Sequence, residues 1–87
     1  MSDYLKIDWL GGNCPLQAEG AIDGVPFYFR ARGKNWSFCV GDDPINHPTW
    51  EYGESYGDGP FDAGWMTTDE ALSFIRKAAA MYMERRP

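Results

Sequence analysis

The strongest constraint on the fold is the dipeptide Asp23-Gly24, which stands between two segments suited to β-strands. Asp-Gly is a favoured pair for a two-residue hairpin turn, because both turn positions take left-handed backbone angles. The segment VPFYFRAR (25–32) that follows alternates apolar and polar residues, as a half-buried strand does. The turn sets these pairs: Ile22 with Val25, Gly20 with Phe27, Ala18 with Phe29, and Leu16 with Ala31. The sequence therefore predicts an antiparallel hairpin in which small residues face large rings.

A second turn, at Gly33-Lys34, extends this hairpin to a further strand with the same buried face. It sets these pairs: Ala31 with Trp36, Phe29 with Phe38, and Phe27 with Val40. Pro26 has no N–H to give to a ladder, and in this register it falls opposite Gly41. We therefore expect the last of these strands to part from its neighbour near Gly41.

An N-terminal segment, 4–10, is a further strand candidate that would pair with 16–22 after the turn 11–13. Its alternation predicts that Leu5, Ile7 and Trp9 point inward. The expected fold class is α+β: an antiparallel meander of three to four strands packed against one C-terminal helix.

The helix is expected in the segment TTDEALSFIRKAAAMYMERRP (67–87). Thr67 lies three residues before Glu70, which is the spacing of a capping box, and Asp69 suits the positive pole of a helix. Apolar residues recur at helical spacing: Leu72, Ile75, Ala79 and Tyr82, widened by Ala71, Ala78 and Met83. This stripe is expected to pack on the Phe27, Phe29, Phe38 face of the sheet.

The chain length of 87 residues fits one domain, 1–87, with a single core. No apolar run is long enough to span a membrane, and the N-terminal segment does not resemble a signal peptide, so a cytoplasmic protein is expected. Cys14 and Cys39 form neither a CxxC pair nor a zinc spacing. We therefore expect free thiols, no metal and no cofactor.

Charge is distributed unevenly along the chain. No Lys or Arg lies between Asn35 and Ile75, whereas that stretch holds eight acids: Asp42, Asp43, Glu51, Glu54, Asp58, Asp62, Asp69 and Glu70. Phosphates are held by cations, so direct binding of nucleic acid or of an anionic membrane by this stretch is not expected. The acids are expected to gather on one outward patch that complements a protein partner with a basic surface.

The segment 41–64 is a long connection in which 50–52 is a candidate short strand. One interpretation is that its rings and carboxylates bind the partner, the rings as anchors and the acids as steering charges. The other is that the rings close the open end of the core and the acids only solvate the loop. The predicted partner-binding residues are Asp42, Asp43, Trp50, Glu51, Tyr52, Glu54, Tyr56, Asp58 and Asp62.

Two alternatives from other functional classes remain open. His47 is the only histidine, and with the neighbouring acids it allows a small enzyme or a metal-dependent hydrolase to be drawn. No motif for a nucleophile, a calcium loop or a phosphate loop accompanies it, so an enzyme is not expected. The second alternative is an assembly component that self-associates through a strand edge at 4–10.

Two stretches, DGVPFYFRARGKNWSF (23–38) and YGDGPFDAGWMTTDEALSFI (56–75), give the chain a resemblance to small acidic accessory proteins of phages and other mobile elements. Some proteins of that kind are anti-CRISPR proteins. The resemblance implies a non-enzymatic inhibitor that occupies a basic surface on a host nucleic-acid-handling complex, with carboxylates where phosphates would sit.

Overall fold

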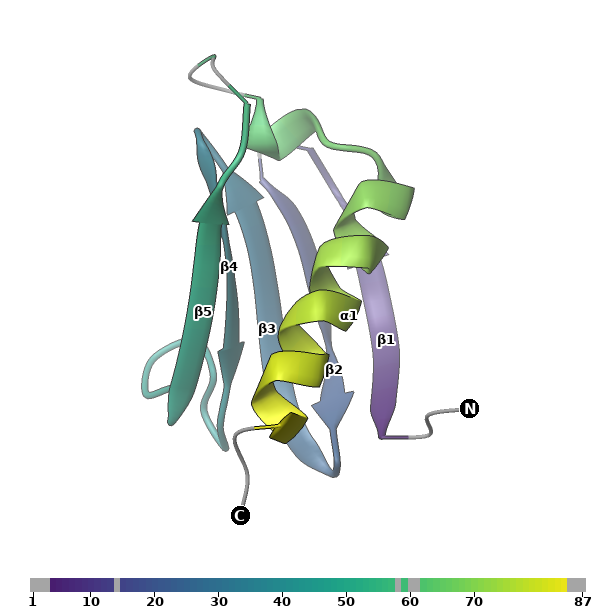
Figure 1. Cartoon of the computed structure of the whole chain (residues 1–87), viewed down its shortest axis with the longest axis vertical. Helices are drawn as coiled ribbons and strands as arrows, with labels where there is room; N and C mark the ends of the chain where they lie inside the picture. Colours follow the sequence, from purple (N-terminus) through teal and green to yellow (C-terminus); the bar gives the residue numbers. More distant parts are fainter. Residues whose placement is uncertain (1–3, 14, 58, 60–61, 85–87) are drawn as a thin grey trace.

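The computed structural model describes residues 4–13, 15–57, 59 and 62–84. Its elements are the strands β1 (Leu5–Gly11), β2 (Leu16–Ile22), β3 (Val25–Arg32), β4 (Asn35–Val40) and β5 (Trp50–Ser55), the short 3-10 helix η1 (Ala63–Trp65) and the helix α1 (Thr68–Glu84). The strands form one antiparallel sheet in the order β1-β2-β3-β4-β5, and α1 lies across one of its faces (Figure 1). The predicted α+β meander is confirmed, with β5 as an added strand.

The central register is the one that the two turns predict. β2 and β3 pair Ile22 with Val25 and Gly20 with Phe27, and β3 and β4 pair Phe27 with Val40. Asp23 and Gly24 have φ angles of 52° and 80°, as the Asp-Gly turn requires. The last β3–β4 pair is Phe27 with Val40, and after it the Gly41 N–H donates to the Pro26 carbonyl. The ladder ends there, near Gly41, as the position of the proline predicted.

The inward pattern predicted for the first strand is wrong at Trp9. The β1–β2 register shifts between Ile7 and Trp9, which leaves Asp8 as the extra residue of a β-bulge. The bulge reverses the alternation, so Leu10 packs toward the core, whereas Trp9 is 50% exposed. A bulge also makes an edge strand a poorer template for pairing, which weakens the case for self-association at 4–10.

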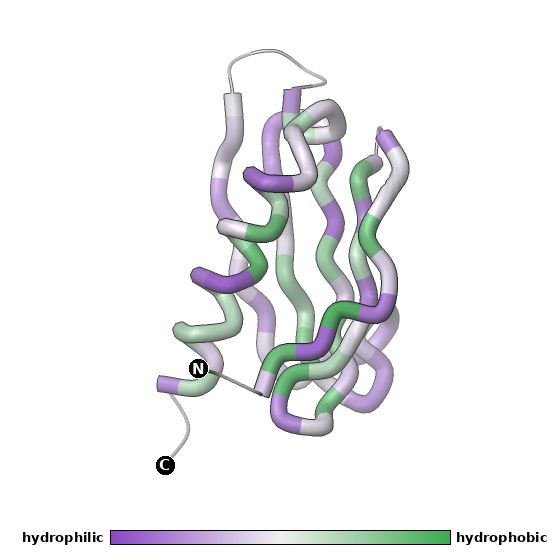
Figure 2. The backbone as a smooth tube through the Cα atoms, turned by 90° about the vertical axis from the view of Figure 1, so that its right-hand side faces the viewer, coloured by the Kyte–Doolittle hydropathy of each residue, from purple (hydrophilic) through white to green (hydrophobic). Residues whose placement is uncertain are grey.

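The helix begins with the predicted capping box. The Thr67 N–H donates to Glu70 Oε1 at 2.9 Å, and the Glu70 N–H donates to Thr67 Oγ1 at 3.1 Å. Buried helix residues come from the predicted stripe: Ala71, Ile75, Ala78, Ala79 and Tyr82. Leu72 and Met83 are half-buried. In Figure 2 the helix runs beside the sheet as a second layer, and hydrophobic segments occur in both.

Replacing Thr67 with alanine tests this cap. The variant loses the Oγ1 acceptor for the Glu70 N–H, so we expect the free energy of unfolding to fall by about 1 kcal/mol. Urea denaturation followed by circular dichroism measures the change. Thr68→Ala is the matched control, because this exposed residue lies just inside the helix and should change stability by less than about 0.5 kcal/mol. Equal effects of the two substitutions would contradict the capping role.

The core lies between the helix and the sheet face that carries Phe27, Phe29 and Phe38, as predicted. All three rings are 1% exposed or less. Trp36 is at the centre of this layer, with ring centroids 5.7 Å from Phe29 and 5.0 Å from Phe74 of α1. In the part of the chain that the structure describes, no helix is both long and apolar enough to cross a membrane.

Candidate protein-binding surface

Strand β5 presents alternate residues of the acidic stretch to opposite faces of the sheet. Its register with β4 pairs Trp50 with Val40 and Tyr52 with Phe38, both buried partners. Trp50, Tyr52 and Glu54 therefore face the helix layer. Glu51 lies between them in the strand, so its side chain lies on the opposite face, where it is exposed.

The predicted binding rings pack on the domain's own core. The Trp50 ring centroid lies 5.4 Å from that of Tyr82, and the Tyr56 centroid lies 5.9 Å from that of Phe74, both on α1. Tyr52 meets Trp36 edge-on at 5.7 Å. Trp50, Tyr52 and Tyr56 are all half-buried in these contacts. Of the two interpretations offered by the sequence, the geometry matches the one in which the rings close the core.

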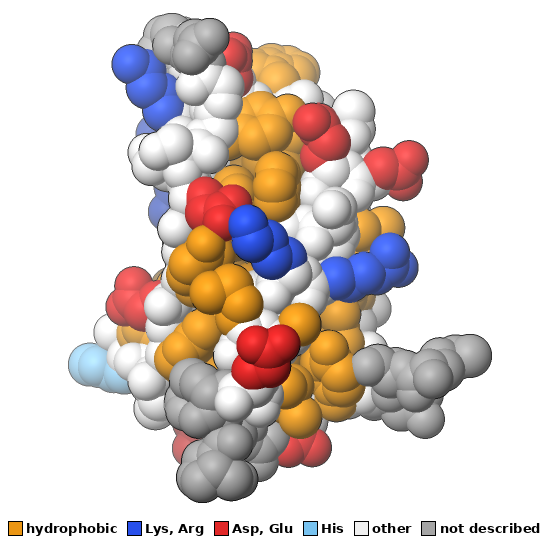
Figure 3. All heavy atoms as spheres, viewed as in Figure 1, with side chains coloured by type: hydrophobic (Ala, Val, Ile, Leu, Met, Phe, Trp, Pro, Cys, Tyr) orange, Lys and Arg blue, Asp and Glu red, His pale blue; other side chains and the backbone are white. Residues whose placement is uncertain are grey.

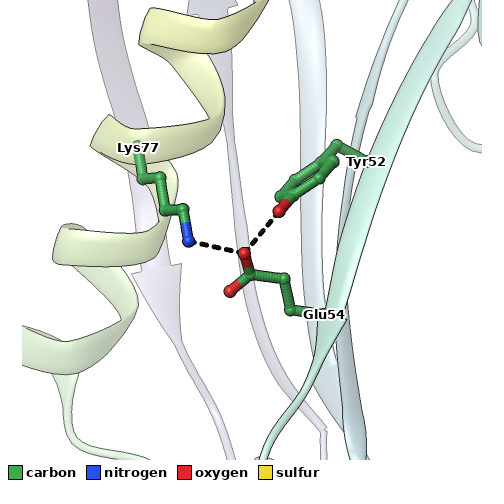
Figure 4. Close-up of polar contacts among 3 residues, drawn as sticks. All are labelled: Tyr52, Glu54 and Lys77. Carbon is green, nitrogen blue, oxygen red and sulfur yellow. Dashed lines mark hydrogen bonds and ion pairs between the residues drawn. The ribbon is translucent and has the colours of Figure 1, made fainter.

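Glu54 is joined to the helix instead of pointing freely outward. Its Oε2 accepts hydrogen bonds from Lys77 Nζ of α1, at 2.5 Å, and from the Tyr52 hydroxyl (Figure 4). Both bonds hold the pKa of Glu54 below its ordinary value, and the bond from Lys77 has the larger effect. The bond from the Tyr52 hydroxyl to Glu54 raises the pKa of Tyr52. The charge of Glu54 is thus used to link β5 with the helix.

The pKa of Glu54 tests this link. A carboxyl with a depressed folded-state pKa adds stability above the ordinary carboxyl value of about 4.3, and this contribution is lost as the pH falls through the folded-state value. In Lys77→Met we expect the pKa of Glu54 to rise, as followed by NMR titration of its side-chain carboxyl. Arg76→Met, which removes an adjacent exposed cation of α1, should leave that pKa within about 0.3 of wild type. An unchanged value in Lys77→Met would contradict the assigned link.

Hydrogen bonds within the domain also involve Tyr56, Asp62 and Glu70. The Tyr56 hydroxyl donates to Glu70 Oε2 at 2.7 Å, a bond that raises the pKa of Tyr56. The Glu70 pKa is lowered, first by the Thr67 N–H and then by the Tyr56 hydroxyl. Asp62 Oδ2 accepts from the Gly59 N–H at 2.9 Å, so its carboxylate shapes the turn before η1. Asp58 lies outside the described residues.

The β4–β5 loop, residues 41–49, is held in shape by its own hydrogen bonds. The Asp43 carbonyl accepts from the His47 N–H at 2.8 Å, and Asp43 Oδ1 accepts from the Asn46 N–H at 3.3 Å. At its end, the Thr49 N–H and hydroxyl both donate to the Val40 carbonyl, at 2.7 and 3.0 Å. The loop therefore presents its exposed side chains from a defined backbone.

Ile45 at the tip of this loop is 62% exposed. Asp42 and Asp43 just before it in the loop are exposed as well, and Glu51 is exposed near the start of β5. We call Asp42, Asp43, Ile45 and Glu51 the acidic loop end. Ile45 was not among the residues predicted from the sequence, because a single apolar residue in a turn such as PINHP (44–48) is common on protein surfaces.

The expectation that the acids gather on one outward patch is wrong for the described residues. Strand alternation separates Glu51 from Glu54, while Glu54 and Glu70 are bonded to groups of the helix layer and its start. On the face that carries α1, Figure 3 shows acidic side chains as separate groups among hydrophobic and basic ones. Only Asp42, Asp43 and Glu51 of the predicted site lie at the acidic loop end.

Of the groups invoked for the enzyme alternative, His47 and Asp43 meet through their backbones, where the His47 N–H donates to the Asp43 carbonyl at 2.8 Å. His47 is exposed, and no group of three or more His, Cys, Asp and Glu side chains in the described part of the chain is arranged to hold a metal ion. Cys39 has a free thiol; its pKa is raised by burial first and by the nearby Glu51 second, which disfavours the reactive thiolate. Cys14 lies outside the described residues.

Comparisons of the chain with protein-family models, with curated proteins and with solved structures find no match.

Proposed function

We propose that the chain is a non-enzymatic protein-binding module that docks the acidic loop end on a basic surface of a partner protein. The observation that carries the proposal is Ile45, 62% exposed on a loop whose backbone makes hydrogen bonds of its own. A large apolar side chain gains little from water at a loop tip, whereas it contributes strongly when a partner covers it.

The flanking carboxylates complete this surface. Asp42 and Glu51 are exposed and form no ion pair with any described residue. Such charges steer association with a cationic surface, whereas an apolar anchor slows dissociation. The loop backbone makes hydrogen bonds of its own, and a loop that is ordered before binding loses less conformational entropy when it binds.

The resemblance to small phage and mobile-element proteins indicates what kind of protein the partner is. It supports an inhibitor, anti-CRISPR-like, that acts in the cytoplasm of a bacterial host on a nucleic-acid-handling defence complex. The basic surface of such a complex normally meets phosphates, for which carboxylates are a substitute. Direct contact of this end with nucleic acid or a membrane is not part of the proposal, because like charges repel.

Affinity capture with matched baits tests the proposal. The tagged chain is immobilised and exposed to nuclease-treated lysate of bacteria, and the bound proteins are identified by mass spectrometry. We expect wild type to retain a partner with a basic surface, and Asp42→Lys/Glu51→Lys to lose at least about 90% of it, as two reversed charges oppose docking. Ile45→Ser should weaken retention about tenfold or more through loss of the anchor.

The control is Asp8→Lys/Glu19→Lys, which makes the same change in net charge at exposed positions of β1 and β2, the strands farthest from β5 in the sheet. It should retain the partner to within about twofold, and raising the salt concentration from about 50 to about 200 mM should lower retention by wild type. If both double variants lost the partner equally, the loss would follow from net charge and not from docking through the acidic loop end. Full retention by Asp42→Lys/Glu51→Lys would refute docking through this end.

A further inference from the structure

The sheet face opposite the helix carries the cationic residues of β3. Both α1 and η1 lie on the other side of the sheet (Figure 1). Alternation in β3 places Tyr28, Arg30 and Arg32 on this open face, because Phe27, Phe29 and Ala31 point into the core. No described element covers these three side chains.

Short side chains next to the arginines leave a hollow. Arg30 pairs with Ser37 and Arg32 with Asn35 across β3 and β4. In the next strand, β5, the residue opposite Ser37 is Gly53, which has no side chain to fill the space. The resulting depression has a volume of about 330 Å³, and its lining residues are Arg30, Arg32, Asn35, Trp36 and Ser37. We call it the arginine hollow.

The guanidinium groups in this hollow are not neutralised by the domain. Among the described residues, no carboxylate forms an ion pair with Arg30 or Arg32. Arg30 Nε is buried and donates to no acceptor. Gln17 lies directly across from Arg30 in β2, but its Oε1 accepts from the Tyr28 hydroxyl at 2.5 Å. A buried donor without an acceptor is uncommon in proteins, so Arg30 Nε has a hydrogen-bonding capacity that the described residues do not use.

We propose that the arginine hollow binds the side-chain carboxylate of an acidic peptide segment from a protein partner. A guanidinium group offers a planar pair of N–H donors that matches the two oxygens of a carboxylate. The Asn35 amide and the Ser37 hydroxyl also line the hollow, and both are hydrogen-bond donors. This site differs from the acidic loop end in its residues and in the sign of its charge, although Glu51 lies on the same open face of the sheet.

The surrounding charges favour a single carboxylate over a nucleic acid. Glu19 and Glu51 are exposed on the same open face, in the adjacent cross-strand row that contains Tyr28. A nucleic acid carries phosphates at close, regular intervals, so its neighbouring phosphates would meet these carboxylates. A peptide with one acidic residue between neutral ones places its single negative charge at the arginines and no further charge beside Glu19 and Glu51.

NMR titration of the full chain tests the site. The probe is the blocked peptide acetyl-Ser-Gly-Glu-Gly-Ser-amide, and the signals followed are the Arg30 Nε–H and the Ser37 amide. We expect saturable shifts that localise to the hollow, and binding at least about tenfold weaker for the Gln analogue of the peptide, which lacks the charge. Arg30→Met should weaken binding of the Glu peptide by a similar factor.

The matched variant is Lys34→Met, which removes an exposed turn cation that does not line the hollow and should change affinity less than about twofold. Sodium acetate and inorganic phosphate are each titrated separately, and both should bind more weakly than the Glu peptide. Equal affinity for the Gln peptide, or no effect of Arg30→Met, would overturn the proposal. Tighter binding of single-stranded oligothymidylate than of the Glu peptide would assign the hollow to nucleic acid instead.

Discussion

Replacement of Trp36 by alanine is expected to lower the free energy of unfolding by about 3–5 kcal/mol, a large part of the stability of a domain this small. The side chain is 1% exposed and stacks on Phe74 of the helix while meeting Phe29 and Tyr52 of the sheet. Its removal therefore opens a cavity at the junction of three elements. Urea denaturation followed by circular dichroism gives the change.

The indole N–H of Trp36 leads to a second expectation, which separates packing from hydrogen bonding. Trp36 Nε1 is buried without a hydrogen-bond partner among the described residues, so truncation loses packing but no hydrogen bond. Trp36→Phe keeps most of the ring and removes the unpaired donor, so it should cost less than half as much as Trp36→Ala. The control is Trp65→Ala, at a side chain that is 63% exposed, with an expected change below about 0.5 kcal/mol. Similar losses at Trp36 and Trp65 would contradict the described core.

Gly20→Ala is expected to destabilise the domain by about 3 kcal/mol or more, mainly by displacing β1. A Cβ atom at Gly20 would lie 2.0 Å from the Lys6 carbonyl oxygen and 2.8 Å from the Phe27 ring. The backbone of β1 cannot yield without breaking its ladder with β2. Hydrogen exchange should therefore show lost protection in β1 before the rest of the sheet.

Gly11→Ala is the control for this substitution, because it lies in the same strand pair. A Cβ there would lie 3.4 Å from the nearest atom, in the Trp9 ring, which is close to ordinary contact. We expect a change of less than about 1 kcal/mol, since the added methyl group meets no atom closer than 3.4 Å. If Gly20→Ala proved as mild as Gly11→Ala, the close approach of β1 to Gly20 would be wrong.

The sheet register could be predicted from the sequence because two turns determine it. The Asp23-Gly24 dipeptide permits one tight geometry, and a two-residue loop leaves no freedom in how the flanking strands align. The helix start was predictable for a similar reason, since the capping box of Thr67 and Glu70 needs only local spacing.

The bulge in β1 could not be predicted in this way. Alternation assigns faces only while every residue has a partner, and the extra residue at Asp8 reverses the faces after it without a Gly or Pro to mark it. Trp9 and Leu10 are both apolar, so the pattern alone does not show which one lies inside. The position of the large exposed ring was missed for that reason.

The candidate site was predicted only in part, because proximity along the chain is not proximity on the surface. Glu51 and Glu54 are three residues apart, yet a strand sends them to opposite faces. Lys77, the partner of Glu54, lies in the helix and far away in sequence. The acid-rich stretch was visible in the sequence, whereas the pairing that removes Glu54 from a free patch depends on how the helix crosses the sheet.

Hydrogen-exchange mass spectrometry of the complex tests the central claim most directly. The chain is compared alone and bound to the partner recovered by affinity capture. We expect increased protection in 42–51, which contains the acidic loop end, and little change in the exposed face of α1 around Ser73 and Arg76. Protection confined to α1 or to β1, with 42–51 unchanged, would contradict the claim that the protein docks through this loop.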